Sequence, residues 1–271
     1  TYIYNMYPET NELHREKIQN HAVTYIGSLV PTKGFHVLAA VWKTILKEVP
    51  DATLNVVGNG KLYGRNSKLG KYNIAEDSYE KQFMPGLTDD EGNILPSVHF
   101  WGVLGVEKND VIRNTCVGVV NPTGRTETFG ISALDFESMS VPVVTIAKGG
   151  FLDTVLNEET GLLYGHTDDF AKDIIMLLKN DKLNEQYGRD GVQLCKKFTP
   201  DKIIKEWNRL FLKVLNDEKR EYIEPDSFME TNLKKYRCLN RKIKNAIGVE
   251  YPISVIGAES FARNILRRMG K

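Results

Sequence analysis

The stretch that begins at Asn121 and reads Asn-Pro-Thr-Gly-Arg-Thr-Glu-Thr-Phe-Gly-Ile-Ser combines acidic, basic and hydroxyl side chains with glycines. The sequence predicts that a strand ends at Asn121, that a loop carries Glu127, and that a helix begins near Gly130. The first turn of such a helix leaves backbone N–H groups without helical partners, here those of Phe129, Gly130, Ile131 and Ser132. Because the helix dipole adds positive potential at that end, the stretch suits a bound diphosphate.

Glu127 has two interpretations. Its carboxylate can accept hydrogen bonds from the hydroxyl groups of a sugar, while Gly130 lets a ligand approach the backbone closely. The same carboxylate can instead serve only to cap the helix that follows it. The residues alone leave both interpretations open.

The elements that would position this stretch begin with residues 23–26, a β-branched and aromatic run that stops at Gly27 as a buried parallel strand does. Apolar pairs then repeat every four residues over 37–49, which predicts an amphipathic helix that ends at Pro50. Residues 54–57 form the next strand. Strand, helix and strand in this order predict a βαβ unit with a right-handed crossover, and therefore a parallel sheet.

The alternation continues after residue 97. Strands are predicted at residues 98–101, 117–121 and 141–146, and helices at residues 108–113, 130–139, 168–179 and 201–215. The helix over 168–179 is predicted to have Asp168 or Asp169 as its cap and an inner stripe of Phe170, Ile174, Leu177 and Leu178. The fold class is thus α/β with a doubly wound parallel sheet, whose ligands bind outside the carboxyl ends of the strands.

Three further segments complete the predicted organisation. Residues 1–22 are polar and form an interdomain segment that leads into the domain at 23–215. Residues 61–97, rich in glycine, asparagine, tyrosine and charge, form an insertion with limited structure of its own. Residues 216–271 form a basic helical tail, with twelve Lys or Arg against six Asp or Glu from residue 219 onward. Packing on the main domain is favoured for this tail over a peripheral contact with a membrane.

Composition excludes several classes of function. A net charge of +1 over 271 residues indicates no nucleic-acid partner. Three cysteines, Cys116, Cys195 and Cys238, are too far apart for a metal site and fit a reducing compartment. No run approaches the roughly 18 apolar residues of a membrane span, and nothing resembles a signal peptide, so we expect a cytoplasmic location.

Several stretches, in one order, resemble the retaining glycosyltransferase family 4, or glycosyl transferases group 1. The stretch from Glu127 to Val144 resembles its Glu-x7-Glu region and the Pro-Val-Val strand that follows. The others are Gly27-Ser-Leu-Val-Pro-Thr-Lys33-Gly34 (its Gly-Arg-Leu-x-x-x-Lys-Gly phosphate loop), Val57-Gly-Asn-Gly60 (its second glycine loop), Val98-His-Phe-Trp-Gly102, Gly149-Gly-Phe-Leu-Asp153 and Glu159-Thr-Gly-Leu-Leu163. Together they cover roughly residues 23–215 of the chain.

The resemblance implies the GT-B architecture, in which two Rossmann-like domains face a cleft and the C-terminal one holds a nucleotide-sugar. This chain would supply that donor-binding domain for a UDP- or GDP-sugar, and transfer would proceed with retention and without a metal or other cofactor. The sequence begins with Thr1 rather than methionine, so we expect a missing N-terminal domain to supply the acceptor site. Alone, the chain should bind donor but transfer little, and polysaccharide or glycolipid biosynthesis is the expected pathway.

The resemblance also assigns roles by position. Lys33 would neutralise the departing diphosphate and Glu127 would bind hydroxyls of the donor sugar, so these two residues are the predicted catalytic pair. Asp135 would take the place of the second glutamate, which in the family meets the ribose. Further donor-binding residues would be Gly27, Ser28, Gly58, Gly60, Arg125, Phe129, Gly130, Ile131 and Ser132.

Two of these positions depart from the family pattern. Ser28 stands where the family has arginine, and Arg125 is either its replacement or an exposed surface arginine. Asp135 is one methylene shorter than glutamate. Glu137 cannot substitute for it, because two residues along a helix turn the side chain by about 200°.

Two other functions stay open. A nucleotide-sugar 2-epimerase has the same architecture, although the histidine and carboxylates that it needs are not found in matching loops. A non-catalytic nucleotide-sugar-binding module is the second alternative. An NAD site is disfavoured because Gly58-Asn-Gly60 lacks the third glycine of a dinucleotide fingerprint.

Overall fold

The structure is a computed structural model that describes residues 6–7, 20–60, 68–216 and 218. The chain divides into two compact units, one of residues 2–216 and the other of Thr1 with residues 217–271. Apart from Asn216 and Glu218, the predicted basic tail lies outside the described residues. Everything below concerns the first unit.

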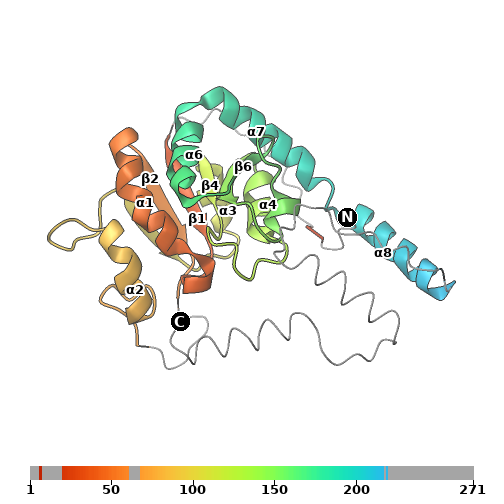
Figure 1. The fold of residues 1–271 in the computed structure, drawn as a ribbon, viewed down its shortest axis with the longest axis horizontal. Helices are drawn as coiled ribbons and strands as arrows, with labels where there is room; N and C mark the ends of the chain where they lie inside the picture. Colours follow the sequence, from red (N-terminus) through yellow and green to blue (C-terminus); the bar gives the residue numbers. More distant parts are fainter. Residues whose placement is uncertain (1–5, 8–19, 61–67, 217, 219–271) are drawn as a thin grey trace. The chain divides into compact units, whose positions relative to one another are not determined.

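Six parallel strands form the sheet (Figure 1). They are β1 Ala22–Ile26, β2 Thr53–Val57, β3 Val98–Gly102, β4 Val117–Val119, β5 Val143–Ile146 and β6 Gly161–Tyr164. Their spatial order is β3-β2-β1-β4-β5-β6, the order of a doubly wound Rossmann fold. The chain reverses direction across the sheet between β1 and β4, so the loops that follow these two strands flank the switch point where such folds bind ligands.

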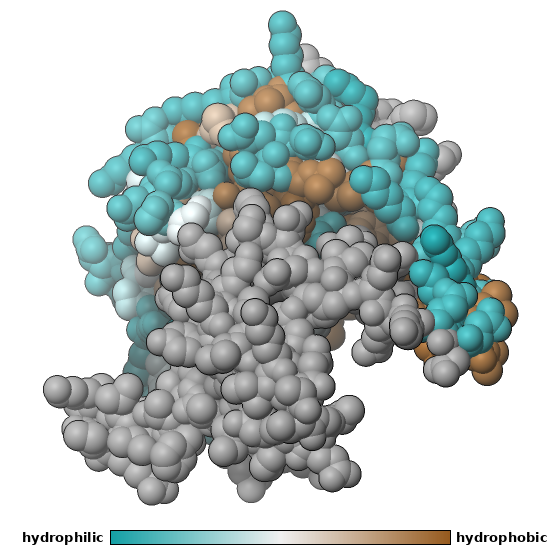
Figure 2. Space-filling view, turned by 45° about the vertical axis from the view of Figure 1, so that its right-hand side comes forward, coloured by the Kyte–Doolittle hydropathy of each residue, from teal (hydrophilic) through white to brown (hydrophobic). Residues whose placement is uncertain are grey.

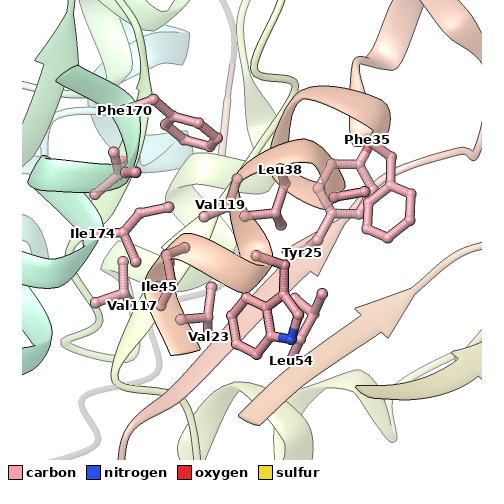
Figure 3. Close-up of a cluster of buried hydrophobic side chains, with 14 of the residues drawn as sticks. Val23, Tyr25, Phe35, Leu38, Ile45, Leu54, Val117, Val119, Phe170 and Ile174 are labelled. Atoms are coloured by element: carbon pink, nitrogen blue, oxygen red, sulfur yellow. The ribbon is translucent and has the colours of Figure 1, made fainter. Parts of the chain in front are cut away.

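Helices cover both faces of the sheet. They are α1 Phe35–Glu48, α2 Asp77–Phe83, α3 Lys108–Arg113, α4 Ile131–Glu137, α5 Phe151–Thr154, α6 Thr167–Lys179, α7 Asp181–Cys195 and α8 Pro200–Leu215. One core cluster joins α1 and α6 to β1, β2 and β4, and Figure 3 shows its strand residues, such as Val23 and Val119, together with helix residues such as Leu38 and Phe170. A second cluster joins α3, α4 and α5 to β5. The predicted α/β class and doubly wound sheet are confirmed.

The predicted insertion has more structure than expected. Residues 61–67 lie outside the described residues, but from residue 68 onward the segment forms α2 and a 3-10 turn, Met84–Gly86, which pack against α1. Tyr79 and Phe83 belong to the core, and the buried Glu80 carboxylate accepts hydrogen bonds from backbone N–H groups of the same segment. The expectation of limited structure is therefore wrong for residues 68–97, because apolar side chains spaced four apart anchor them.

Other differences are local. Helix α6 begins at Thr167, and its N-cap is His166 rather than Asp168 or Asp169, while the predicted inner stripe is buried as expected. The helices α5 and α7 and the strand β6 were not predicted as elements. Hydrophilic residues cover most of the coloured surface in Figure 2. Among the described residues, no helix has both the length and the apolar character that crossing a membrane requires.

Candidate functional site

The loops that follow β1, β2, β4 and β5 are bonded to one another at the carboxyl edge of the sheet. Leu29 N–H donates to Asn59 O at 3.0 Å, which joins the loops after β1 and β2. Thr123 Oγ1 donates to Thr32 O at 2.9 Å, which joins the loops after β4 and β1. Gly150 N–H donates to Glu127 O at 3.1 Å, which adds the loop after β5. The four loops therefore form one packed ledge, which carries the predicted site residues from Gly27 to Lys33, Gly58, Gly60, Arg125 and Glu127.

Three glycines make this close approach of loops feasible. Gly34 has φ +70°, and a Cβ there would lie 2.7 Å from Thr123 Cγ2. Gly58 has φ +132°, and its Cβ would collide with the carbonyl oxygen of Gly27. Gly60 is equally crowded, since a Cβ would lie 2.8 Å from Leu29 O. Loop packing alone thus accounts for these glycines, and proximity of Gly58 and Gly60 to a nucleotide base stays a prediction.

Lys33 and Glu127 meet across the switch point. Lys33 Nζ lies 2.8 Å from Glu127 Oε2, and the two side chains are 29% and 14% exposed. The same oxygen accepts a hydrogen bond from Asn121 Nδ2 at 3.2 Å, and Glu127 Oε1 accepts one from Gly130 N–H at 3.2 Å. Glu127 therefore caps the start of α4 and pairs with a lysine from the loop after β1. The capping interpretation is confirmed, and the binding of sugar hydroxyls stays a prediction.

The backbone N–H groups at the start of α4 are as predicted, except for one. We expected four unpartnered N–H groups, but that of Gly130 donates to Glu127, so the expectation is wrong at this residue. The N–H groups of Phe129, Ile131 and Ser132 have no acceptor within the described residues. These three N–H groups can donate to a ligand, and the Glu127 carboxylate lies between the start of α4 and Lys33, since it contacts both the Gly130 N–H group and the Lys33 ammonium.

The backbone of the loop after β4 is strained. Asn121 has φ 28° and Thr126 has φ 58°, and positive φ is a costly conformation for a β-branched residue. The loop is closed by a hydrogen bond from Asn121 Nδ2 to Arg125 O at 2.9 Å. Strain of this kind persists only where the surroundings impose it, and it is frequent where side chains are held for binding.

Arg125 and Ser28 lie on the same ledge. Arg125 is exposed. The pKa of His36, at the start of α1, is lowered mainly by the burial of that ring and further by the positive charge of Arg125. His36 Nδ1 lies 3.1 Å from the Tyr79 hydroxyl, and the rings of the two side chains contact edge to face. Ser28 is half-buried and uses its carbonyl to accept from Val30 N–H. Arg125 is thus a cation close to His36, at the start of α1, and Ser28 lies on the loop that leads to this helix.

Asp135 lies on the second turn of α4 in a different setting. Its Oδ2 is 2.7 Å from Lys108 Nζ, and its Oδ1 accepts a hydrogen bond from the Tyr7 hydroxyl at 3.1 Å. Burial, reinforced by the charge of Asp135, raises the pKa of Tyr7 well above its usual value, so the phenol stays a donor. The sequence had singled out neither Lys108 nor Tyr7, since one begins a helix like any surface lysine and the other lies in an irregular segment.

Glu137 lies on the opposite side of α4, as predicted. It is fully buried, and Thr160 Oγ1 donates to its Oε1 at 2.7 Å. Its Oε2 has no hydrogen-bond partner among the described residues. Burial raises the pKa of this carboxyl well above its usual value, so Glu137 is a neutral part of the core and no substitute for Asp135.

The ledge can bind an anion and a hydroxyl group side by side. The Lys33 ammonium has two N–H donors beyond the one directed at Glu127, and the carboxylate keeps one lone pair, on Oε1, that can accept from a hydroxyl. No group of three or more His, Cys, Asp or Glu residues among the described ones could hold a metal ion.

Comparison with known proteins gives this geometry a context. The sequence matches the family described as glycosyl transferases group 1 over residues 9–193. An uncharacterized glycosyltransferase of Methanocaldococcus jannaschii is 25% identical over 66% of this chain and 44% of its own length. The capsular polysaccharide biosynthesis glycosyltransferase CapM of Staphylococcus aureus is 27% identical over 66% of this chain and 42% of its own. The chain therefore spans less than half the length of these relatives.

Solved structures show the same fold. HepE of Anabaena, crystallised with UDP-glucose, matches with a TM-score of 0.58 and 18% identity over 72% of this chain and 49% of its own. TarM of S. aureus matches with a TM-score of 0.60 and 19% identity over 75% of this chain and 37% of its own. The C-terminal domain of a glycosyl transferase group 1 protein of Francisella tularensis matches with a TM-score of 0.54 and 20% identity, over 72% of this chain and 96% of that domain. The fold is one Rossmann-like domain of the GT-B architecture.

Proposed function

The chain belongs to the glycosyl transferases group 1 family, and we propose that it is the donor-binding domain of a retaining glycosyltransferase that uses a nucleoside-diphosphate sugar. The observation that carries the proposal is the contact between Lys33 and Glu127 at 2.8 Å across the switch point. A lysine from one loop and a carboxylate from another meet where doubly wound sheets bind nucleotides. Three N–H groups that have no acceptor among the described residues follow Glu127 at the start of α4 and add to the support.

The two side chains would divide the donor between them. The Lys33 ammonium would bind the diphosphate, whose negative charge grows as the glycosidic bond breaks, so the contact strengthens in the transition state. Glu127 would accept hydrogen bonds from the donor sugar's hydroxyls while its cap to Gly130 holds it in place. A fixed carboxylate is useful here because misplacement of the sugar by about 1 Å can cost a hundredfold in rate.

Arg125 would supply the charge that Ser28 lacks. It is exposed and lies close enough to His36 to affect the titration of that ring. An arginine on the loop after β4 would then add a second cation for the diphosphate beside Lys33. Because protein cations and N–H groups would carry the leaving-group charge, the proposal includes neither a metal ion nor another cofactor.

The remaining parts of the reaction belong to the whole protein. HepE was crystallised with UDP and with UDP-glucose, which favours a UDP-sugar over a GDP-sugar as the donor of this chain. Since the chain spans less than half of its relatives, we propose that an N-terminal domain supplies the acceptor site and that the chain alone transfers little. A cytoplasmic reaction in polysaccharide synthesis is part of the same proposal, and CapM is named for such a pathway.

A thermal-shift panel tests the proposal. UDP, GDP, ADP, their sugar conjugates and NAD would be added to the wild type, Lys33→Met, Glu127→Gln and the control Lys179→Met. Lys179 forms a 2.7 Å ion pair with Glu48 where α6 and α1 end, away from the loops described here. A ligand at about ten times its dissociation constant adds roughly 1.4 kcal/mol, which is a shift of a few degrees.

The expected result separates the two roles. One nucleotide stabilises the wild type and Lys179→Met, Lys33→Met loses the response to the diphosphate, and Glu127→Gln loses only the additional response to the sugar. A response to NAD alone, or none to any nucleotide, would contradict the proposed function.

A further inference from the structure

The Tyr25 hydroxyl lies against the base of the loop that carries Lys33. It donates a hydrogen bond to Lys33 O at 2.8 Å, and Ser28 O lies 3.5 Å from the same hydroxyl oxygen. These two carbonyl groups belong to the first and the last residue of the segment 28–33, so one hydroxyl group spans the loop. Gly27 makes room for it, since a Cβ there would lie 2.9 Å from the hydroxyl oxygen. The loop after β1 is therefore closed over a single buried donor.

The ring that carries this hydroxyl is held by the core. Tyr25 lies in β1 and is 0% exposed. Its ring centroid is 5.0 Å from that of Phe35, the first residue of α1 (Figure 3). Phe35 in turn contacts Phe83 of α2 edge to face, with centroids 5.1 Å apart. Because a close-packed interior leaves such rings little freedom, the hydroxyl donates from a fixed place.

The hydroxyl acts as a neutral donor. Burial, reinforced by the neighbouring Tyr79 and Glu127, raises the pKa of Tyr25 well above its usual value. The phenol therefore keeps its proton throughout the neutral pH range and adds no charge to the ledge. Its effect on Lys33 is one of geometry rather than of electrostatics.

The hydrogen bond fixes the backbone of the residue that pairs with Glu127. Lys33 N–H donates to Val30 O at 2.9 Å and Lys33 O accepts from Tyr25, so both polar groups of its backbone are held. The ammonium of the same residue lies 2.8 Å from Glu127 Oε2. A flexible lysine loses entropy when an anion holds its ammonium, and a backbone that is already ordered lowers the total cost of binding.

We propose that Tyr25 is a positioning residue for Lys33, and that its hydroxyl holds residues 28–33 in the conformation from which the ammonium binds the diphosphate of the donor. This inference rests on the proposed function, since it requires a nucleoside diphosphate at Lys33. Tyr25 acts through Lys33 and makes no contact with the ligand. Tyr25→Phe would keep the packing of the ring and remove only the hydrogen bond.

A double-mutant cycle on nucleotide binding tests the proposal. UDP, GDP and ADP, each with its monophosphate, would be titrated calorimetrically into the wild type, Tyr25→Phe, Lys33→Met and the variant with both changes. The measured quantity is the ratio of the dissociation constant of the monophosphate to that of the diphosphate. Tyr25→Phe should lower this ratio about fivefold, the size of one hydrogen bond. In the Lys33→Met background the same change should leave the ratio as it is, because residues that act through one another are not additive.

Tyr72→Phe is the matched control. The Tyr72 hydroxyl donates to Gly92 O at 2.7 Å, in a segment that carries none of the predicted site residues. This variant loses the same kind of bond, from a phenol to a backbone carbonyl, and should keep the ratio of the wild type.

Each contrary result has its own meaning. If Tyr25→Phe keeps the ratio of the wild type, the inference fails and the proposed function stands. A fall in the ratio that is as large in the Lys33→Met background, or that Tyr72→Phe reproduces, also overturns the inference, because the hydroxyl would then support the fold rather than Lys33. If none of the three diphosphates binds to the wild type, the proposed function fails and this inference fails with it.

Discussion

Helix α4 carries two carboxyl groups two residues apart whose surroundings are of opposite kinds. Asp135 accepts hydrogen bonds from both Lys108 and Tyr7. Glu137 faces α7 and β6, where Thr160 donates to one oxygen and the other oxygen has no partner among the described residues. The same functional group is therefore a paired ion on one side of the helix and a neutral acid on the other.

The difference extends to packing. On the Glu137 side, α7 approaches α4 through Gly188 and Gly191, and a Cβ at Gly191 would lie only 3.0 Å from that of Glu137. On the ledge side, Ile131 is 53% exposed and Arg125 is exposed, so side chains there have room to meet a ligand. The inner side of α4, which carries Glu137, is closely packed against α7, whereas the outer side, which carries Ile131, is exposed. Stability and binding should therefore respond to different substitutions.

The largest effect is expected from Gly188→Ala. The new Cβ would collide with the carbonyl oxygen of Ser140, which is backbone and cannot rotate away. Overpacking of this kind should lower the free energy of unfolding by about 3 kcal/mol, or roughly 6–12 °C in melting temperature. The matched control is Gly165→Ala, since a Cβ at Gly165 meets nothing within 4 Å. Thermal denaturation of the two variants measures the difference, and an equal loss in both would show that α7 is not closely packed on α4.

Glu137→Met should change stability in the other direction. Burial raises the pKa of Glu137 above its usual value of 4.5, so the folded state holds a proton that the unfolded state releases as the pH rises. The wild type therefore loses stability relative to the variant as the pH increases from 4.5 towards the raised value. Glu137→Met removes a buried oxygen that has no partner among the described residues, which stabilises the protein, but it also removes the hydrogen bond from Thr160. The net gain in the free energy of unfolding should be about 1–2 kcal/mol at neutral pH.

The measurement for Glu137 is urea denaturation of both proteins between pH 5 and pH 8, with Asp135→Asn as the comparison from the other side of α4. Asp135 forms an ion pair, so its replacement should destabilise the protein rather than stabilise it. A wild type that stays as stable as Glu137→Met across this pH range would mean that Glu137 is charged and compensated.

Much of the sheet and of the ledge could be predicted from the sequence. The β-branched runs that end at Gly27 and Gly58 mark strands by composition, and the period of apolar residues marks α1. Because the carboxyl ends of parallel strands share one edge, the order of the motifs was enough to expect Lys33 and Glu127 on the same side. The direct contact between Lys33 and Glu127 requires β1 and β4 to be neighbours in the sheet. The order of elements along the chain gives this neighbourhood only if the fold is taken to be doubly wound.

What the sequence did not reveal depends on packing between distant segments. Helix α7 contains Gly188 and Gly191, which lower helix propensity and therefore suggest a loop from the sequence alone. The structure shows why glycines stand there, since a Cβ at either position would be too close to α4 or to the residues that follow it. Lys108 and Tyr7 carry no pattern that distinguishes them from other lysines and tyrosines, and only the fold brings them to Asp135. The bond between Gly130 and Glu127 likewise depends on a loop conformation that spacing does not specify.

The smallest effect is expected from Thr126→Asn, on the outer side. Among the described non-glycine residues with positive φ, Thr126 is the β-branched one, and asparagine adopts this conformation at lower cost. The gain is offset by loss of the bond from Thr126 Oγ1 to Arg125 O, so the net stabilisation should be about 0.5 kcal/mol. Thr128→Asn, at an exposed position without positive φ, should give no gain and is the matched control. Calorimetric melting of the two variants would decide: a gain at Thr126 alone means that the loop carries strain, whereas a loss there means that the threonine itself holds Glu127 in place.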